Sequence, residues 1–163
     1  METKNGLTKG QVLAMAGGII SIIGVFLPWY SASMSASSIG FASGISVNGL
    51  GWKSGEGVLL GLISGDINWQ FQGIGVLALG IAGIVVSVIL KERIQSIAML
   101  ACGLLVVGGG VVNLQGIGSL SGKILGATMQ SGAGYGLYVV VLGGAAAAAG
   151  GLIAWRELEA RQV

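Results

Sequence analysis

Four long apolar runs divide the chain. They are Gln11–Trp29, Phe71–Leu90, Ile94–Val112 and Tyr135–Trp155, and none of them contains Asp, Glu, Lys or Arg. A helix needs about 20 largely apolar residues to cross a hydrocarbon core of about 30 Å, and its backbone must be hydrogen-bonded internally. The pattern therefore predicts an all-α membrane protein in which these runs form a bundle of four transmembrane helices, a single domain over residues 1–163.

The first long connection, residues 30–70, has a pattern of its own. Over residues 31–47 serine alternates with apolar residues, and a period of two is typical of half-buried strands. A flexible Ser/Gly-rich linker is the alternative. We expect strands within residues 31–52, closed by a tight turn at Asn48–Trp52. The apolar run at 57–65 is too short to span and suits a helix lying at the outer interface.

The other two connections differ greatly in length. The turn at 91–93 is so short that spans 2 and 3 must form an antiparallel hairpin. The second long connection, residues 113–134, is rich in Gly and Ser. Its apolar residues could add a strand or a short helix against the first connection, and a mobile connector is an equal alternative. The sequence thus predicts a small β-rich cap on one side of the bundle.

Basic residues are distributed unevenly between the two sides of the spans. Segments 1–10, 91–93 and 156–163 carry Lys4, Lys9, Lys91, Arg93, Arg156 and Arg161, whereas the long connections carry only Lys53 and Lys123. Because cytoplasmic segments are enriched in Lys and Arg, we expect a multi-pass protein of the cell membrane with both termini in the cytoplasm and an extracellular cap. The first run is long for a signal peptide, so we expect it to be a retained span.

Aromatic residues fit the same arrangement. Interfacial aromatic belts are expected where spans leave the bilayer. The outer ends carry Trp29, Tyr30, Trp69, Phe71, Tyr135 and Tyr138, and one inner end carries Trp155.

Composition excludes several classes of protein. Only 9% of the residues are charged, against about 25% in soluble domains, and the mean hydropathy is +0.88. A net charge of +2 without a basic cluster argues against a nucleic-acid partner. With no histidine and one cysteine, a histidine-dependent active site and a disulfide framework are excluded, and a zinc site is not expected.

Ionisable groups inside spans usually mark proton relays, ion paths or substrate sites. The four runs contain none, so we expect no enzyme, no cofactor and no metal. The lone cysteine, Cys102, is expected to be a packing residue. A channel or passive carrier ranks lower, because the sparse polar residues of the spans would have to face one lumen. Those residues are Ser21, Gln72, Ser87, Gln95 and Ser96.

Small residues are the expected means of association between the helices, since lipid offers no hydrophobic driving force for it. The predicted packing positions are Gly17, Gly18, Ala82, Gly83, Gly143, Ala147 and Gly151. The favoured interpretation is packing within one subunit. Span 4 has small residues on two neighbouring faces, so packing against a second subunit is the alternative.

Two short motifs carry a resemblance to a known family. Trp29 follows the first span, and Gly49-Leu50-Gly51-Trp52 follows later in the same connection. With four spans and a β-rich first loop, this is similar to the claudin and peripheral-myelin-protein tetraspan superfamily, whose claudins have a Gly-Leu-Trp motif there. Claudins add two disulfide-bonded cysteines in that loop, whereas Cys102 is expected in span 3. The resemblance implies a scaffold with a small extracellular β-layer that assembles laterally or head to head.

The sequence therefore predicts a non-enzymatic, structural role. We expect the protein to self-associate, or to bind a membrane partner, through the cap and the small-residue helix faces. The predicted packing or contact residues of the cap are Trp29, Met34, Phe41, Gly49, Leu50 and Trp52. Alternatives are an accessory subunit of a larger membrane complex and a viral or vesicle coat protein.

Overall fold

The computed structural model describes residues 8–36, 40–56, 70–89, 92–117, 120–124 and 127–160. Its helices are α1 (Lys9–Phe26), α3 (Gln70–Ile89), α4 (Glu92–Gly116) and α5 (Tyr135–Glu159). Its strands are β1 (Pro28–Ala36), β2 (Phe41–Asn48), β3 (Lys53–Glu56), β4 (Leu120–Ile124) and β5 (Ala127–Ala133). The interfacial helix expected at 57–65 lies outside the described residues.

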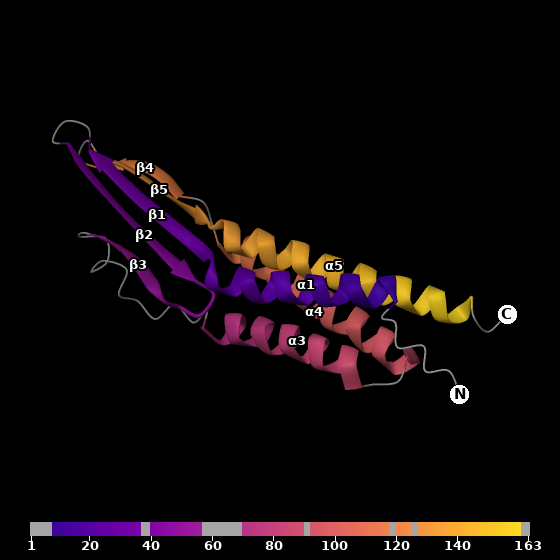
Figure 1. Cartoon of the computed structure of the whole chain (residues 1–163). Coiled ribbons are helices and arrows are strands. Elements are labelled where there is room, and N and C mark those ends of the chain that lie inside the picture. Colours follow the sequence, from indigo (N-terminus) through magenta and orange to yellow (C-terminus); the bar gives the residue numbers. More distant parts are fainter. Residues whose placement is uncertain are drawn as a thin grey trace.

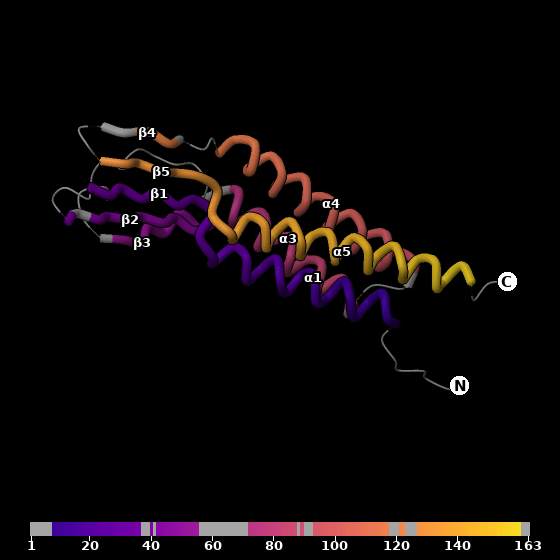
Figure 2. Tube along the Cα trace, turned by 90° about the horizontal axis from the view of Figure 1, so that it is seen from above, coloured from indigo at the N-terminus to yellow at the C-terminus, as the bar shows by residue number. Residues whose placement is uncertain are grey.

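The four helices form an elongated bundle, and the strands extend from one end of it (Figure 1). Helix α5 packs closely against α1 on one side and α4 on the other, while α3 contacts α1 and α4 (Figure 2). Three of the helices, α1, α4 and α5, are long and apolar enough to cross a membrane. In α3 the described apolar stretch, Gln72–Ser87, is shorter.

Helix α1 is defined by clear signals at both ends. Thr8 and Gln11 form a capping box, in which the Thr8 hydroxyl accepts from the Gln11 amide (3.2 Å) and the Gln11 side chain accepts from the Thr8 amide (2.8 Å). Leu27 is extended because the residue before a proline disfavours the helical region. The helix therefore ends at Phe26, three residues earlier than predicted, and Pro28 starts a strand.

Helices α4 and α5 both run past their predicted ends. Helix α4 continues to Gly116, and the Asn113 side chain donates to the Gly109 carbonyl at 2.7 Å within it. The second connection is correspondingly shorter than the predicted 113–134. Helix α5 begins at Tyr135 as predicted and continues to Glu159, which extends it into the predicted cytoplasmic tail.

All five strands belong to one antiparallel sheet with the order β3-β2-β1-β5-β4. The strands predicted in the first connection are therefore present, and the second connection supplies β4 and β5. The interpretation of the second connection as a simple connector was wrong. Its apolar residues alternate weakly, and the two strands depend on the pairing of β5 with β1 and of β4 with β5.

The alternation in β1 gives the sheet two different faces. Ala32 and Ile45 are buried on one face, where Met34 and Met129 pack beside them. Ser31, Ser33 and Ser35 are exposed on the opposite face. Because successive residues of a strand point to opposite sides, this pattern places one apolar face toward protein and one polar face outward.

Candidate functional site

The closest helix contact lies between α1 and α5 and repeats every seven residues. Gly10, Gly17 and Gly24 of α1 face Gly150, Gly143 and Gly136 of α5 respectively. A Cβ atom on these α1 glycines would lie 2.6, 2.5 and 3.1 Å from the carbonyl oxygens of the facing glycines. A Cβ on each of these three glycines would also lie within 3.0 Å of a backbone nitrogen of α5, closer than real Cβ atoms come, so only glycine permits this backbone spacing.

The neighbouring side of α5 makes a similar contact with α4. A Cβ on Gly144 would lie 3.1 Å from the Gly103 carbonyl oxygen, and one on Gly151 would lie 3.0 Å from that of Ser96. Both small-residue faces of span 4 are therefore occupied within the chain. This agrees with the favoured interpretation of packing within one subunit.

Five of the predicted packing residues lie at these close approaches or beside them. Gly17, Gly143 and Ala147 belong to the α1–α5 contact, Gly151 faces α4, and Gly18 faces Ile84 of α3. Gly83 also faces α4, since a Cβ there would lie 3.9 Å from Cys102, which is an ordinary contact. Ala82 was wrong as a packing position within the bundle, because it is exposed on α3.

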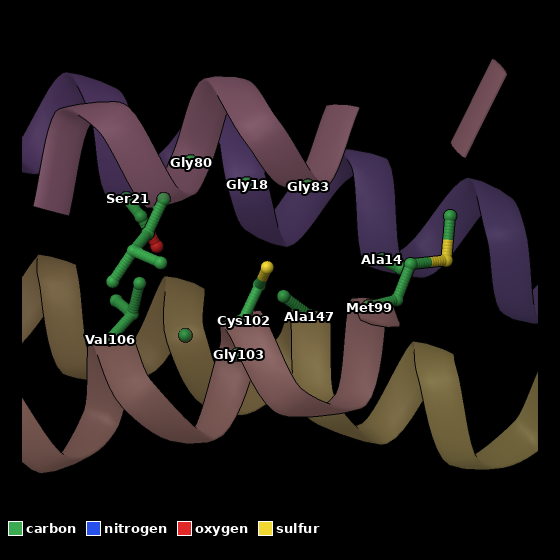
Figure 3. Close-up of a pocket in the computed structure, with 12 residues that line it drawn as sticks. Ala14, Gly18, Ser21, Gly80, Gly83, Met99, Cys102, Gly103, Val106 and Ala147 are labelled. Atoms are coloured by element: carbon green, nitrogen blue, oxygen red, sulfur yellow. The ribbon is translucent and has the colours of Figure 1, made fainter. Parts of the chain in front are cut away.

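A small cavity of about 20 Å³ lies in the middle of the bundle, and all four helices line it (Figure 3). This is room for about one water molecule. Cys102 points into it from α4, toward Gly80 and Gly83 of α3 (Figure 3). Ser21 also lines it, and its hydroxyl donates to the Gly17 carbonyl at 3.0 Å.

The polar residues considered for a channel serve other contacts. Gln95 is buried and accepts a hydrogen bond from the Gln11 side chain at 2.9 Å, while its own amide donates to the Ser87 carbonyl. These bonds join α1, α3 and α4 near the end of the bundle opposite the sheet. Gln72 is exposed on α3 instead. The described polar side chains thus form no single line through the bundle.

Trp29 is the residue that joins the sheet to the bundle. It is 0% exposed, and its indole N–H donates to the Gly24 carbonyl at 3.0 Å. A Cβ on Gly49 would lie 2.6 Å from the Trp29 ring, and the Gly49 amide donates to the Val25 carbonyl at 2.9 Å. These bonds satisfy carbonyls left open at the end of α1. Trp29 is therefore a core residue, and its predicted place in an interfacial belt was wrong.

Neither junction between helix and central strand contains a linker. Only Leu27 separates α1 from β1, and only Gly134 separates β5 from α5. The Gly134 amide donates to the Trp29 carbonyl at 2.7 Å, directly between the two junctions. The most closely packed helix pair, α1 and α5, therefore continues as the adjacent strand pair β1 and β5 (Figure 2). Such a connection holds the cap in a defined orientation on the bundle.

The other predicted cap residues have different environments. Met34 is half-buried beside Met129, and Leu50 packs against the core around Trp29. Trp52 is 66% exposed, so most of its surface is available for contact. Its amide donates to the Asn48 side chain at 2.9 Å, which closes the predicted turn. Phe41 begins β2, and its side chain lies outside the described residues.

The polar face of the sheet contains an open groove of about 270 Å³ along β1 and β5. Ser31, Ser33 and Gln130 line it, and Gly132 lies among them without a side chain. Hydroxyl and amide groups both donate and accept hydrogen bonds, and none of these side chains is charged. The groove can therefore make neutral hydrogen bonds. The sequence signal for it was the run of alternating serines.

Comparisons with known proteins add no family to this description. No protein-family model matches the chain, and no curated protein matches it.

In the part of the chain that the structure describes, no group of three or more His, Cys, Asp or Glu could hold a metal ion.

Proposed function

We propose that this chain is an integral membrane protein that acts by contact, using its outer sheet as the contact surface. The observation that carries the proposal is the exposed, uncharged face of β1 and β5, held on the bundle by the linker-free junctions at Trp29 and Gly134. A rigidly held surface suits recognition, since little conformational freedom is lost when a partner binds.

The membrane placement has its own support. Exposed aromatic side chains, Trp52, Tyr135 and Tyr138, belong to the end of the bundle that bears the sheet. Lys9 and Arg156 belong to the opposite end. Aromatic side chains prefer the membrane interface and basic residues the cytoplasmic side, so we propose a cap outside the cell and both termini inside. Helix α3 has 20 residues, about 30 Å of helix, and serves as the fourth span.

The helix surfaces support a contact role for the cap rather than for the bundle. The small-residue faces of α5 are already covered by α1 and α4, and its outward residues include Leu142 and Leu152. Large aliphatic side chains of this kind suit lipid. The claudin-like architecture expected from the sequence belongs to this proposal, because it too displays a β-layer from four spans.

The test compares two arginine substitutions on the same sheet. Ser33→Arg places a charge in the groove of the contact face, and Ser54→Arg places one on the exposed edge strand β3. Both proteins are purified in a mild detergent with native lipid, and their particle mass is measured. We expect wild type and Ser54→Arg to be assemblies, and Ser33→Arg to be a single protomer with unchanged tryptophan fluorescence.

The subunit composition of the assembly distinguishes a self-assembling scaffold from an accessory subunit. A homo-oligomer indicates a self-assembling scaffold, and an unrelated chain in fixed ratio indicates an accessory subunit. A wild-type protein that remains a lone protomer in native membranes would refute the proposal. Retention of the full assembly by Ser33→Arg would refute it equally.

A further inference from the structure

The exposed face of the three central strands carries no charge. Strand register places its residues in rows across β2, β1 and β5, for example Ser46, Ser31 and Gly132, then Gly44, Ser33 and Gln130. Every one of these side chains is small or neutral. The register places charged residues of this face on the edge strands, with Glu56 of β3 paired to Gly44 and Lys123 of β4 paired to Thr128. Three central strands without Lys or Glu are unusual for a soluble surface, where charges normally prevent association.

The two edge strands of the same sheet have features that discourage pairing with a strand of another molecule. Strand β3 has 4 residues and includes Lys53, and strand β4 has 5 residues and includes Lys123. Gly55 in β3 has a φ of +152°, which departs from regular strand geometry. Short strands, lysines and irregular backbone discourage edge-to-edge pairing. Edge-to-edge pairing of the sheet is therefore disfavoured, whereas its polar face remains exposed.

The direction of the strands determines how a partner can approach this face. The strands run outward from one end of the bundle, obliquely to its long axis in Figure 1 and nearly in line with it in Figure 2, so the sheet rises from the proposed membrane with its faces turned largely sideways. A partner for the polar face must therefore stand beside the protein. A second copy anchored in the same bilayer presents its own sheet at the same distance from the membrane and in the same orientation.

The chemistry of the face is complementary to itself. A serine hydroxyl both donates and accepts, so a serine can bond to the same serine of a second copy, whereas a row of lysines would repel its copy. Gly44 and Gly132 leave room for the two faces to approach closely. A twofold axis brings one surface patch against itself, which is the arrangement that such a face can satisfy.

We infer that the polar face of the sheet pairs with the same face of a second copy in the same membrane, about a twofold axis that runs beside β1 at Ser33. This inference rests on the proposed contact role of the cap and names its partner. The three central strands, of 9, 8 and 7 residues, present roughly 400 Å². Pairing these strands buries roughly 800 Å² in total, which is the size of a small, transient interface.

The axis predicts which residues meet their own copies. Ser33 lies at the axis and meets Ser33 of the second copy. Ser54 lies two strands away from β1. At about 4.8 Å per strand, the two Ser54 residues are roughly 19 Å apart sideways. Ser54 is therefore a matched control, an exposed serine of the same sheet that cannot reach its copy.

Cross-linking with a short bis-maleimide tests the inference. The variants are Ser33→Cys and Ser54→Cys on a Cys102→Ala background, reconstituted at low density in liposomes. We expect at least a fivefold excess of covalent dimer for Ser33→Cys over Ser54→Cys. Two differently tagged chains should form mixed dimers when they share a vesicle, and none when two vesicle populations are mixed.

Any other cross-linking result contradicts pairing of two copies through the polar face. Equal cross-linking at both positions indicates random collision, and mixed dimers between vesicles indicate tip contact across two membranes. If Ser33→Cys in native membranes cross-links to a different protein of fixed mass and never to itself, the partner is that protein, and the proposed contact role still stands. Absence of any Ser33 adduct in liposomes and in native membranes overturns both the inference and the proposed function.

Discussion

The substitution Gly17→Ala tests whether the spacing of α1 and α5 depends on glycine. The new Cβ would lie 2.4 Å from the Ala147 backbone nitrogen and 2.5 Å from the Gly143 carbonyl oxygen, and ordinary contact begins at 3.4 Å, so the helices must separate by about 1 Å. Gly108→Ala on α4 is the matched control, because a Cβ there meets nothing within 4 Å. Both substitutions gain about 1 kcal/mol of helix propensity, which cancels in the comparison.

The difference between the two variants therefore measures the contact alone. Over-packing a well-packed site costs about 1–3 kcal/mol, and we expect Gly17→Ala to be less stable than Gly108→Ala by that amount. Reversible unfolding with SDS in mixed micelles, followed by tryptophan fluorescence, gives the two free energies of unfolding. Equal stability of the two variants would refute the reasoning, because it would mean that α1 and α5 separate at no cost.

Three further predictions concern the junction, the interior hydrogen bonds and the exposed tryptophan. Trp29→Phe removes the bond to the Gly24 carbonyl and should lower the free energy of unfolding by about 1–3 kcal/mol; a smaller loss in the same assay contradicts its role at the junction. A double-mutant cycle between Gln11 and Gln95 should give a coupling of about 0.6–1.7 kcal/mol, and additivity would contradict the bond between them. Trp52→Ala should leave unfolding unchanged because that side chain is 66% exposed, but it should weaken partitioning into lipid vesicles; a destabilised protein would show that Trp52 packs in the cap.

Helix positions could be predicted because lipid imposes a simple rule on sequence. A run without charges must satisfy its own backbone, so the apolar runs located α1, α3, α4 and α5 to within a few residues. The errors were at the ends, where local contacts decide. Pro28 ended α1 early, and the Asn113 bond to Gly109 lies within an extension of α4 beyond its apolar run.

Individual site residues were harder to predict, since small residues look alike in sequence. The predicted packing positions included Ala82, which is exposed, and omitted Gly10 and Gly24, although the contacts of α1 with α5 repeat every seven residues at Gly10, Gly17 and Gly24. The seven-residue repeat was visible in the sequence as a signal for a closely packed antiparallel pair. The two tryptophans predicted as cap contacts also differ in burial, because Trp29 is enclosed at the two junctions whereas Trp52 is 66% exposed.

The sequence by itself determined that this is a chain of four apolar helices with alternating strands between them, because charge and periodicity act locally along the chain. The tertiary structure alone decided which glycines meet, that β5 joins β1, and that the serines lie on an exposed face whose three central strands carry no charge. Those properties depend on residues far apart in the chain. Their physical cause is backbone approach and strand pairing between segments that no local pattern connects.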